Sequence, residues 1–338
     1  MKMFIADHWK DYEVIDTSAG DKLERWGKYI LRRPDPQVIW QGDMKNPAWK
    51  KLNGHYHRSQ KGGGEWEFFD LPKQWTISYT LGGMGKSTLT AQGRETYGVP
   101  AEQLKTLESL RPEDRTLTFH LKPFAFKHTG LFPEQAANWD WFSELILREV
   151  QRRREKGTDQ PVRVLNLFAY TGGATLAAAK AGAQVTHVDA SKGMVQWAKE
   201  NAQSSGIPET SVRWLVDDCT KFVEREIRRG NTYDAVIMDP PSYGRGPKGE
   251  IWKIEDSVYP LVELTSKLLT KDSLFFLLNS YTTGLQPAVM SYMLGLAIAR
   301  KLGGTVHSEE VGLLVTETGL VLPCGCSGRW QSPAPEQA

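Results

Sequence analysis

The sequence predicts a Rossmann-like α/β domain, with a mostly parallel sheet and an antiparallel C-terminal hairpin, after a smaller, mostly β N-terminal domain. Residues 162–189 have the pattern of strand, helix and strand, and further apolar runs alternate with helical segments as far as residue 322. Residues 1–125 instead contain short β-like runs separated by Pro, Gly, Asp and Asn. We therefore predict domains at 1–125 and 161–338, joined by a linking segment and helix at 126–160.

The segment 162–189 organises the second domain. An apolar strand at 162–167 runs into the turn 168–173, a small-residue helix follows, and a second strand ends at Asp189. Gly172 and Gly173 allow a sharp turn and the close approach of a ligand to the backbone. An acid at the end of the second strand can accept hydrogen bonds from the hydroxyls of an adenosine ribose. The turn lacks the G-x-G-x-x-G spacing, so NAD and FAD are disfavoured.

Chain length, net charge, apolar runs and cysteine content limit the kinds of protein that this chain can be. A chain of 338 residues predicts two domains, and a net charge of +2 neither requires nor excludes a nucleic-acid partner. The sequence has no apolar run of membrane-spanning length and no signal-peptide core, which predicts a cytoplasmic protein. The three cysteines, Cys219, Cys324 and Cys326, have neither a disulfide framework nor C-x-x-C spacing, so we expect no metal site.

The N-terminal 125 residues combine aromatic runs with basic side chains. Tryptophan and other aromatic residues interleaved with basic residues can stack on RNA bases and hold the phosphate backbone. Packing of the aromatic side chains in a small β core is the preferred interpretation, and RNA binding is the alternative. The basic residues concerned are Arg32, Arg33, Lys45, Lys50, Lys51, Arg58 and Lys61.

A helix from 134 to about 154 precedes the second domain. Pro133 suits its first turn, and an apolar stripe indicates that the helix packs on the following sheet. The helix ends in a basic run that includes Arg148 and 152–154. This charge complements the helix dipole, and a solvated helix end explains it as well as RNA binding does.

The remaining strands bring further polar residues to the same edge. Strands are predicted at 212–216, 233–238 and 274–278, followed by a helix at 284–301 and a hairpin at 304–311 and 312–322. Asp218 follows the first of these strands, and residues 239–243, Asp-Pro-Pro-Ser-Tyr, follow the second. Because parallel strands end at one edge of the sheet, these groups should converge with Asp189 on one crevice.

Along the chain, the Gly-bearing turn is followed by Asp189, by Asp218 and then by Asp-Pro-Pro. This order resembles that of the class I S-adenosylmethionine-dependent methyltransferases over about 160–323. Residues 166–173, Asn-Leu-Phe-Ala-Tyr-Thr-Gly-Gly, together with 127–130, Lys-His-Thr-Gly, are more narrowly similar to the bacterial large-subunit ribosomal RNA methyltransferase group. The resemblance implies S-adenosyl-L-methionine (SAM) as cofactor, with Asp189 on the ribose, Asp218 on the adenine amino group and the turn at the methionine end. The implied cofactor residues are Gln135, Phe168, Ala169, Tyr170, Thr171, Gly172, Gly173, Asp189, Ala190, Ser191, Asp218, Cys219, Asp239 and Pro240.

Residues 239–243 resemble the motif that nucleic-acid base methyltransferases place against the target base. A proline-stiffened turn can fix carbonyls that accept from an exocyclic amine, and an aromatic side chain can stack on a flipped base. Methyl transfer is an in-line displacement, so positioning supplies most of the catalysis. The predicted catalytic residues are Asp239, Tyr243 and Ser280, and the predicted substrate-binding residues are Pro241, Ser242 and Tyr243.

The residues at the end of the fifth predicted strand distinguish this chain from the related enzymes that methylate cytosine C5. Relatives that methylate cytosine C5 need a cysteine nucleophile near that position, where this chain has 279–281, Asn-Ser-Tyr. Methylation of a ring nitrogen, an exocyclic amine or a ribose hydroxyl stays open. The leading hypothesis is methylation of a ribosomal RNA base. The alternatives are methylation of a small molecule or protein, and a non-catalytic RNA-binding protein that keeps the fold.

Overall fold

The computed structural model describes residues 2–59, 63–83, 89–97, 104–124, 127–245, 251–282 and 284–333, which form two compact units. Unit 1 comprises Met1–Leu104, Glu108–Asn138 and Val311–Cys324. Unit 2 comprises Lys105–Leu107, Trp139–Glu310 and Gly325–Ala338. The C-terminal part of the chain therefore contributes to both units. The domain boundaries at 125 and 161 stay a prediction.

The first part of the chain is mostly β structure, as predicted. Its described residues form a five-stranded sheet in the order β2-β3-β4-β5-β6 and a two-stranded sheet of β7 and β8. The elements are β1 (Met3–Ile5), β2 (Tyr12–Ser18), β3 (Asp21–Trp26), β4 (Tyr29–Pro34), η1 (Pro47–Lys50), β5 (Gly54–Arg58), β6 (Gly64–Phe68), β7 (Trp75–Thr80), α1 (Ala91–Thr96), α2 (Lys105–Glu108), η2 (Pro112–Arg115), β8 (Thr116–Leu121) and η3 (Pro133–Gln135).

A buried ion pair lies in the core of unit 1. The Glu24 carboxylate, fully buried, accepts two hydrogen bonds from the Arg33 guanidinium, at 2.6 and 2.8 Å, and one from the Tyr12 hydroxyl at 2.7 Å. Burial alone would raise the pKa of Glu24, but the charges of Arg33 and Lys22 lower it to about 2. Removal of one partner would leave a buried charge uncompensated, which would strongly destabilise the protein.

The second part of the chain alternates helices with strands. Its elements are α3 (Ala136–Glu155), β9 (Arg163–Leu167), α4 (Gly173–Lys180), β10 (Gln184–Asp189), α5 (Lys192–Ser204), η4 (Glu209–Ser211), β11 (Val212–Val216), α6 (Cys219–Arg228), β12 (Ala235–Met238), β13 (Tyr243–Arg245), β14 (Ile251–Lys253), α7 (Ile254–Ser266), β15 (Phe275–Ser280), α8 (Pro287–Leu294), the π-helical turn η5 (Gly295–Ala299), α9 (Arg300–Leu302), β16 (Thr305–Leu314) and β17 (Val321–Gln331).

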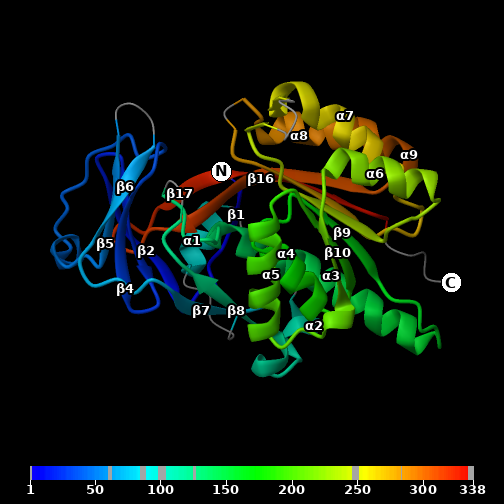
Figure 1. Ribbon diagram of the computed structural model, residues 1–338, viewed down its shortest axis with the longest axis horizontal. Helices are drawn as coiled ribbons and strands as arrows, with labels where there is room; N and C mark the ends of the chain where they lie inside the picture. Colours follow the sequence, from blue (N-terminus) through cyan, green and yellow to red (C-terminus); the bar gives the residue numbers. More distant parts are fainter. Residues whose placement is uncertain are drawn as a thin grey trace. The chain divides into compact units, whose positions relative to one another are not determined.

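The large sheet has the order β1-β16-β17-β15-β12-β9-β10-β11 among the described residues. Strands β15, β12, β9, β10 and β11 are parallel neighbours, whereas β17 runs antiparallel to β15. In unit 2, α3, α4 and α5 lie on one face of the sheet and α6, α7 and α8 on the other (Figure 1). This confirms the predicted doubly wound sheet with its antiparallel hairpin. Among the described residues, no helix combines the length and apolarity needed to cross a membrane.

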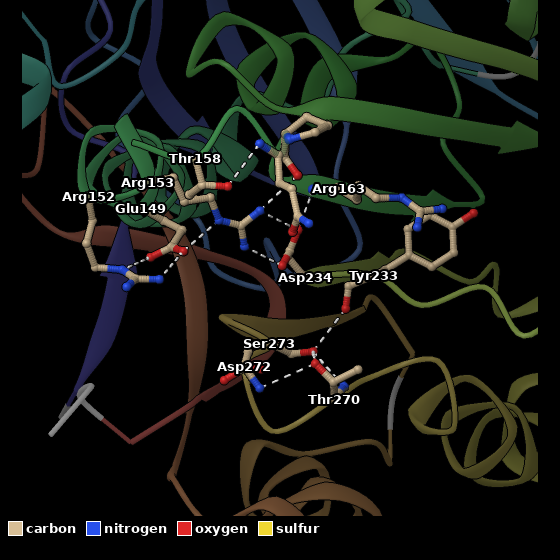
Figure 2. A network of polar contacts seen from close by, with 12 residues as sticks. Glu149, Arg152, Arg153, Thr158, Arg163, Tyr233, Asp234, Thr270, Asp272 and Ser273 are labelled. Carbon is tan, nitrogen blue, oxygen red and sulfur yellow. Dashed lines mark hydrogen bonds and ion pairs between the residues drawn. The ribbon is translucent and has the colours of Figure 1, made fainter. Parts of the chain in front are cut away.

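A network of polar contacts lies at the edge of this sheet where the parallel strands begin, as Figure 2 shows. Arg153 of α3 donates to Glu149 at 2.7 Å and to Asp234, just before β12, at 2.6 Å. The second Asp234 oxygen accepts from the Arg163 backbone at the start of β9, also at 2.6 Å. Arg152 is bound to Glu149 as well. Arg153 therefore holds α3 to the edge opposite the strands' carboxyl ends, whereas the Arg152–Glu149 pair lies within α3.

Candidate functional site

Backbone hydrogen bonds join the loops that follow β9, β10, β11 and β12. The Ala169 amide donates to the Val188 carbonyl at 3.1 Å, and the Asp217 amide donates to the Asp189 carbonyl at 3.0 Å. The Asp239 amide donates to the Leu167 carbonyl at 3.4 Å. The structure thus brings the turn 168–173, Asp189, the loop before α6 and the start of 239–243 to one edge of unit 2.

The turn after β9 carries backbone strain. Phe168 and Tyr170 have φ values of 54° and 50°, in the left-handed region that non-glycine residues seldom adopt. Each such residue costs about 1–3 kcal/mol and is stable only when its surroundings hold it. Here the Tyr170 amide donates to the Asp189 carboxylate at 2.8 Å, and Asn201 of α5 donates to the Thr171 carbonyl at 2.9 Å. Ala169 and Thr171 are buried.

The two glycines of the turn are needed for helix packing. A Cβ atom on Gly172 would lie 2.9 Å from the Ala198 Cβ, and one on Gly173 would lie 2.7 Å from the Trp139 ring. Gly172 also has a φ of 88°. The expected sharp turn is present, but the close neighbours of both positions are protein atoms of α3 and α5. The presence of glycine at these two positions therefore also reflects the tight packing at the start of α4.

Asp189 is the half-buried acid at the end of β10. Its two oxygens accept from the Tyr170 and Ser191 amides, each at 2.8 Å. Burial raises the pKa of the carboxyl, and these two bonds oppose the rise. A carboxylate oxygen has two acceptor positions, so each oxygen keeps one for a further donor. Two remaining acceptors match the two hydroxyls of a ribose, so the side chain fits the proposed role.

The residues after Asp189 begin the next helix. Ala190 is exposed, and the Ser191 side chain caps α5 by accepting from the Met194 amide at 3.4 Å. Asp218 is likewise an exposed helix cap, whose carboxylate accepts from the Lys221 amide at 2.8 Å. Capping and a contact with an adenine are compatible, because the cap uses one oxygen.

Cys219 lies beneath the turn. Its sulfur accepts from the Phe168 amide at 3.4 Å, and the side chain is buried. Burial raises the pKa of this thiol to about 12, so it is a neutral, unreactive group at neutral pH. The contact of Cys219 with an adenine ring stays a prediction.

Residues 239–243 are held by two side chains from other segments. The Trp252 indole of β14 donates to the Pro241 carbonyl at 2.6 Å, and the Thr282 hydroxyl donates to the Ser242 hydroxyl at 2.6 Å. Tyr243 opens the β13–β14 hairpin and is 52% exposed. The sequence predicts that this turn offers carbonyls to a substrate amine, and the Trp252 bond occupies one of the two acceptor positions of the Pro241 carbonyl. Pro240 is buried and Asp239 is half-buried.

Ser280 lies inside the fifth strand, only 2% exposed, and its hydroxyl accepts from the Thr282 amide at 3.1 Å. It is paired across the sheet with Cys326 of β17, a neighbour that sequence reasoning did not find. The Cys326 thiol donates to the Leu285 carbonyl at 2.8 Å, and burial raises its pKa to about 12. Its position near the strand end therefore does not give it the thiolate character that C5 methylation requires.

Gln135 belongs to unit 1 and is buried there. Its side-chain oxygen accepts from the Asn138 amide group at 2.8 Å. The other predicted cofactor residues belong to unit 2. Its contact with the cofactor stays a prediction.

Most of the N-terminal tryptophans and some of the basic residues have structural roles. Trp9, Trp26, Trp49 and Trp75 are buried, which agrees with the preferred interpretation of the aromatic run. Arg32, Arg33 and Lys45 form ion pairs with Asp21, Glu24 and Asp43. Lys50, Lys51 and Arg58 are exposed, and Lys61 lies outside the described residues.

Comparisons with known proteins agree with this geometry. Residues 128–284 match the protein family described as S-adenosylmethionine-dependent methyltransferase. The solved SAM-dependent methyltransferase from Agrobacterium tumefaciens is 31% identical, with a TM-score of 0.78 over 97% of this chain and 93% of that chain. Among curated proteins, the ribosomal RNA large subunit methyltransferase K/L of Pseudoalteromonas translucida is 29% identical over 191 residues, 56% of this chain. Ribosomal RNA large subunit methyltransferase K of Neisseria meningitidis is 32% identical over 139 residues, 40% of this chain. The matches span 24% and 39% of these two curated relatives.

Proposed function

Because the chain belongs to the S-adenosylmethionine-dependent methyltransferases, we propose that it transfers a methyl group to a base of ribosomal RNA. The observation that carries the proposal is the loop 239–243. Two side-chain hydrogen bonds fix this loop at the carboxyl end of β12, and it ends in an exposed tyrosine. The curated relatives named above, which act on ribosomal RNA by name, support the same substrate class.

The cofactor residues that we propose in unit 2 are those of the strained turn and of the loops that follow the neighbouring strands. The Asp189 carboxylate accepts hydrogen bonds from the two ribose hydroxyls on its two remaining lone pairs. The Asp218 carboxylate accepts a hydrogen bond from the adenine amino group, and Cys219 lies beside the adenine ring. The turn holds the methionine end. When bound, SAM supplies an electrophilic methyl group on a sulfonium. The proposed cofactor set is Gln135, Phe168, Ala169, Tyr170, Thr171, Gly172, Gly173, Asp189, Ala190, Ser191, Asp218, Cys219, Asp239 and Pro240.

The substrate side consists of Pro241, Ser242 and Tyr243. An exposed phenol ring at the start of a short hairpin can stack on an extruded base, which contributes about 1–3 kcal/mol per base. Asp239 is the first residue of the loop 239–243 and can accept a proton or a hydrogen bond from the base. Ser280 acts as a positioning residue, since it holds the Thr282 amide and Thr282 in turn holds Ser242.

Unit 1 carries a surface suited to nucleic acid. A hollow of about 460 Å³ is lined by Lys28, Tyr29, Phe68 and Phe69, among others. Phe68 and Phe69 are each 55% exposed, and the Phe68 ring is stacked parallel to Trp66 with centroids 6.1 Å apart. Exposed aromatic rings beside a lysine offer both base stacking and phosphate attraction. We propose that this surface contacts the RNA substrate.

The test is transfer of label from tritiated SAM to ribosomal RNA taken from a strain that lacks the protein. We expect nuclease-sensitive incorporation. Tyr243→Ala should lower turnover by about fivefold to 150-fold while leaving S-adenosylhomocysteine affinity unchanged, because a lost stack is worth about 1–3 kcal/mol. Tyr292→Ala removes a tyrosine that is 72% exposed on α8 and serves as the matched control.

Two results would count against the proposal. Label that enters protein or a small-molecule fraction but not RNA would favour the alternative substrates. Equal turnover of wild type, Tyr243→Ala and Tyr292→Ala would remove the stacking role of Tyr243. Digestion of labelled RNA to nucleosides then identifies the methylated atom.

A further inference from the structure

A cluster of three metal-ligating side chains lies on the β5–β6 hairpin, within the part of unit 1 that the structure describes. The ligand atoms of His55, His57 and Glu67 all lie within 4.8 Å of one another. The His57 Nε2 and a Glu67 carboxylate oxygen are 2.8 Å apart, and the two imidazole rings have centroids 3.8 Å apart. Cysteine spacing gives no sign of this cluster, because none of its three residues is a cysteine.

Strand register explains how the three side chains meet. His55 and His57 are two residues apart on β5, so they lie on the same face. That face is the outer one, because the alternating residues Gly54 and Tyr56 are buried. In the antiparallel pairing, His55 is opposite Glu67 and His57 is diagonal to it.

The surrounding charges favour a cation. Glu65 is exposed on β6 opposite His57, which adds a second carboxylate to the same face. Arg32 on the neighbouring strand is paired with Asp21 at 2.6 Å, so its charge is largely balanced.

We propose that His55, His57 and Glu67 bind one Zn²⁺ ion. Two imidazoles and a carboxylate are a ligand set that zinc accepts, with bonds of about 2.0–2.2 Å. Tetrahedral ligands at that distance are about 3.3 Å apart. The present separations therefore need only side-chain adjustment within the cluster. The ion takes the place of the direct contact between the His57 ring and the Glu67 carboxylate, and its remaining position faces solvent.

The location gives the ion a structural role. Strand β6 is the last strand in the order of the five-stranded sheet, and four of its five residues are exposed. An edge strand with so little buried apolar surface gains little stability from packing. A metal ion ligated from both strands fixes β6 onto β5. The binding free energy then adds to the stability of the hairpin, as in other coupled metal sites.

The test uses the full chain without an affinity tag, freed of metal with a chelator and titrated calorimetrically with Zn²⁺. We expect one equivalent to bind with micromolar or tighter affinity, and Co²⁺ to give the absorption of a low-symmetry site. His57→Gln and Glu67→Gln should each weaken binding at least about tenfold, since one of three ligands is lost. His307→Gln is the matched control, because His307 forms an exposed pair with Glu309 at 3.3 Å without a second imidazole in the pair.

Circular dichroism of the metal-free proteins checks that the surface variants keep the fold. Zn²⁺ should raise the melting temperature of wild type and His307→Gln but not of His57→Gln. The proposal is overturned if wild type binds no Zn²⁺ at 0.1 mM, or if His57→Gln and Glu67→Gln bind it as tightly as wild type. Neither result depends on the methyl-transfer assay.

Discussion

Replacement of Asp189 by asparagine should selectively remove recognition of the cofactor's ribose. Each carboxylate oxygen already accepts one backbone amide, from Tyr170 or Ser191, and keeps one acceptor position. Asparagine retains one acceptor oxygen and turns the other position into a donor. One charge-assisted hydrogen bond is lost, and such bonds contribute about 1.5–3 kcal/mol. The dissociation constant of S-adenosylhomocysteine should therefore rise about tenfold to 150-fold.

Calorimetric titration with two ligands separates this contact from general damage to the turn. Wild type should bind S-adenosylhomocysteine much more tightly than its 2′,3′-dideoxy analogue, and Asp189→Asn should lose most of that preference. Asp218→Asn should keep the preference, whatever its effect on overall affinity, because Asp218 caps the next helix. An unchanged preference in Asp189→Asn would refute the ribose assignment.

The affinity for the cofactor should depend on pH through the Asp189 carboxyl. Burial raises the pKa of Asp189, and only the ionised carboxylate accepts from both hydroxyls. A ligand that binds the ionised form is favoured above that pKa. Affinity should thus be highest at neutral pH and fall as the pH drops through the raised pKa, and Asp189→Asn should show a flatter profile.

Three further outcomes follow from the packing of unit 2. Gly173→Ala should destabilise the protein by about 1–3 kcal/mol in urea unfolding, because the new methyl group would meet the Trp139 ring at 2.7 Å; Trp139→Phe in the same chain should recover part of the loss. Burial lowers the pKa of His187 to about 3. Below about pH 6.5 this residue is therefore protonated in the unfolded chain but stays neutral in the folded chain. Stability should then fall by about 2 kcal/mol between pH 7 and pH 5 through this residue, and His187→Gln should show a smaller fall. Cys326→Ser should leave methyl transfer within about twofold of wild type, since its thiol is protonated at neutral pH; loss of turnover with full cofactor binding would revive a nucleophilic role.

The sheet and the convergence of its loops were predictable because both depend on local patterns. Apolar runs that end in polar residues identify parallel strands and their carboxyl ends, and the order of the chain then brings those ends together. The helix predicted from residue 134 begins with η3 and continues as α3 to Glu155. Asp189 ends the second strand of the β-α-β unit, which is why the sequence singles it out, and its contact with a ribose stays a prediction.

Features that depend on contacts between distant segments were not predictable. The pairing of Cys326 with Ser280 needs the register of β17 on β15, and nothing in the local sequence of either strand defines it. The bond from Trp252 to Pro241 likewise depends on how the β13–β14 hairpin folds back. The His55–Glu67 cluster needs the β5–β6 register, which a search by cysteine spacing could not detect.

Phe168 connects the two halves of the candidate site. Its amide is bonded to the Cys219 sulfur, and its ring lies against the Trp252 ring with centroids 5.5 Å apart. Trp252 in turn holds the Pro241 carbonyl. The strained Phe168 backbone depends on these neighbours, so we expect a ligand bound at the turn to act on the loop 239–243 through the Phe168–Trp252 contact. Since coupling between two binding events is reciprocal, cofactor and acceptor should each strengthen binding of the other through this one residue.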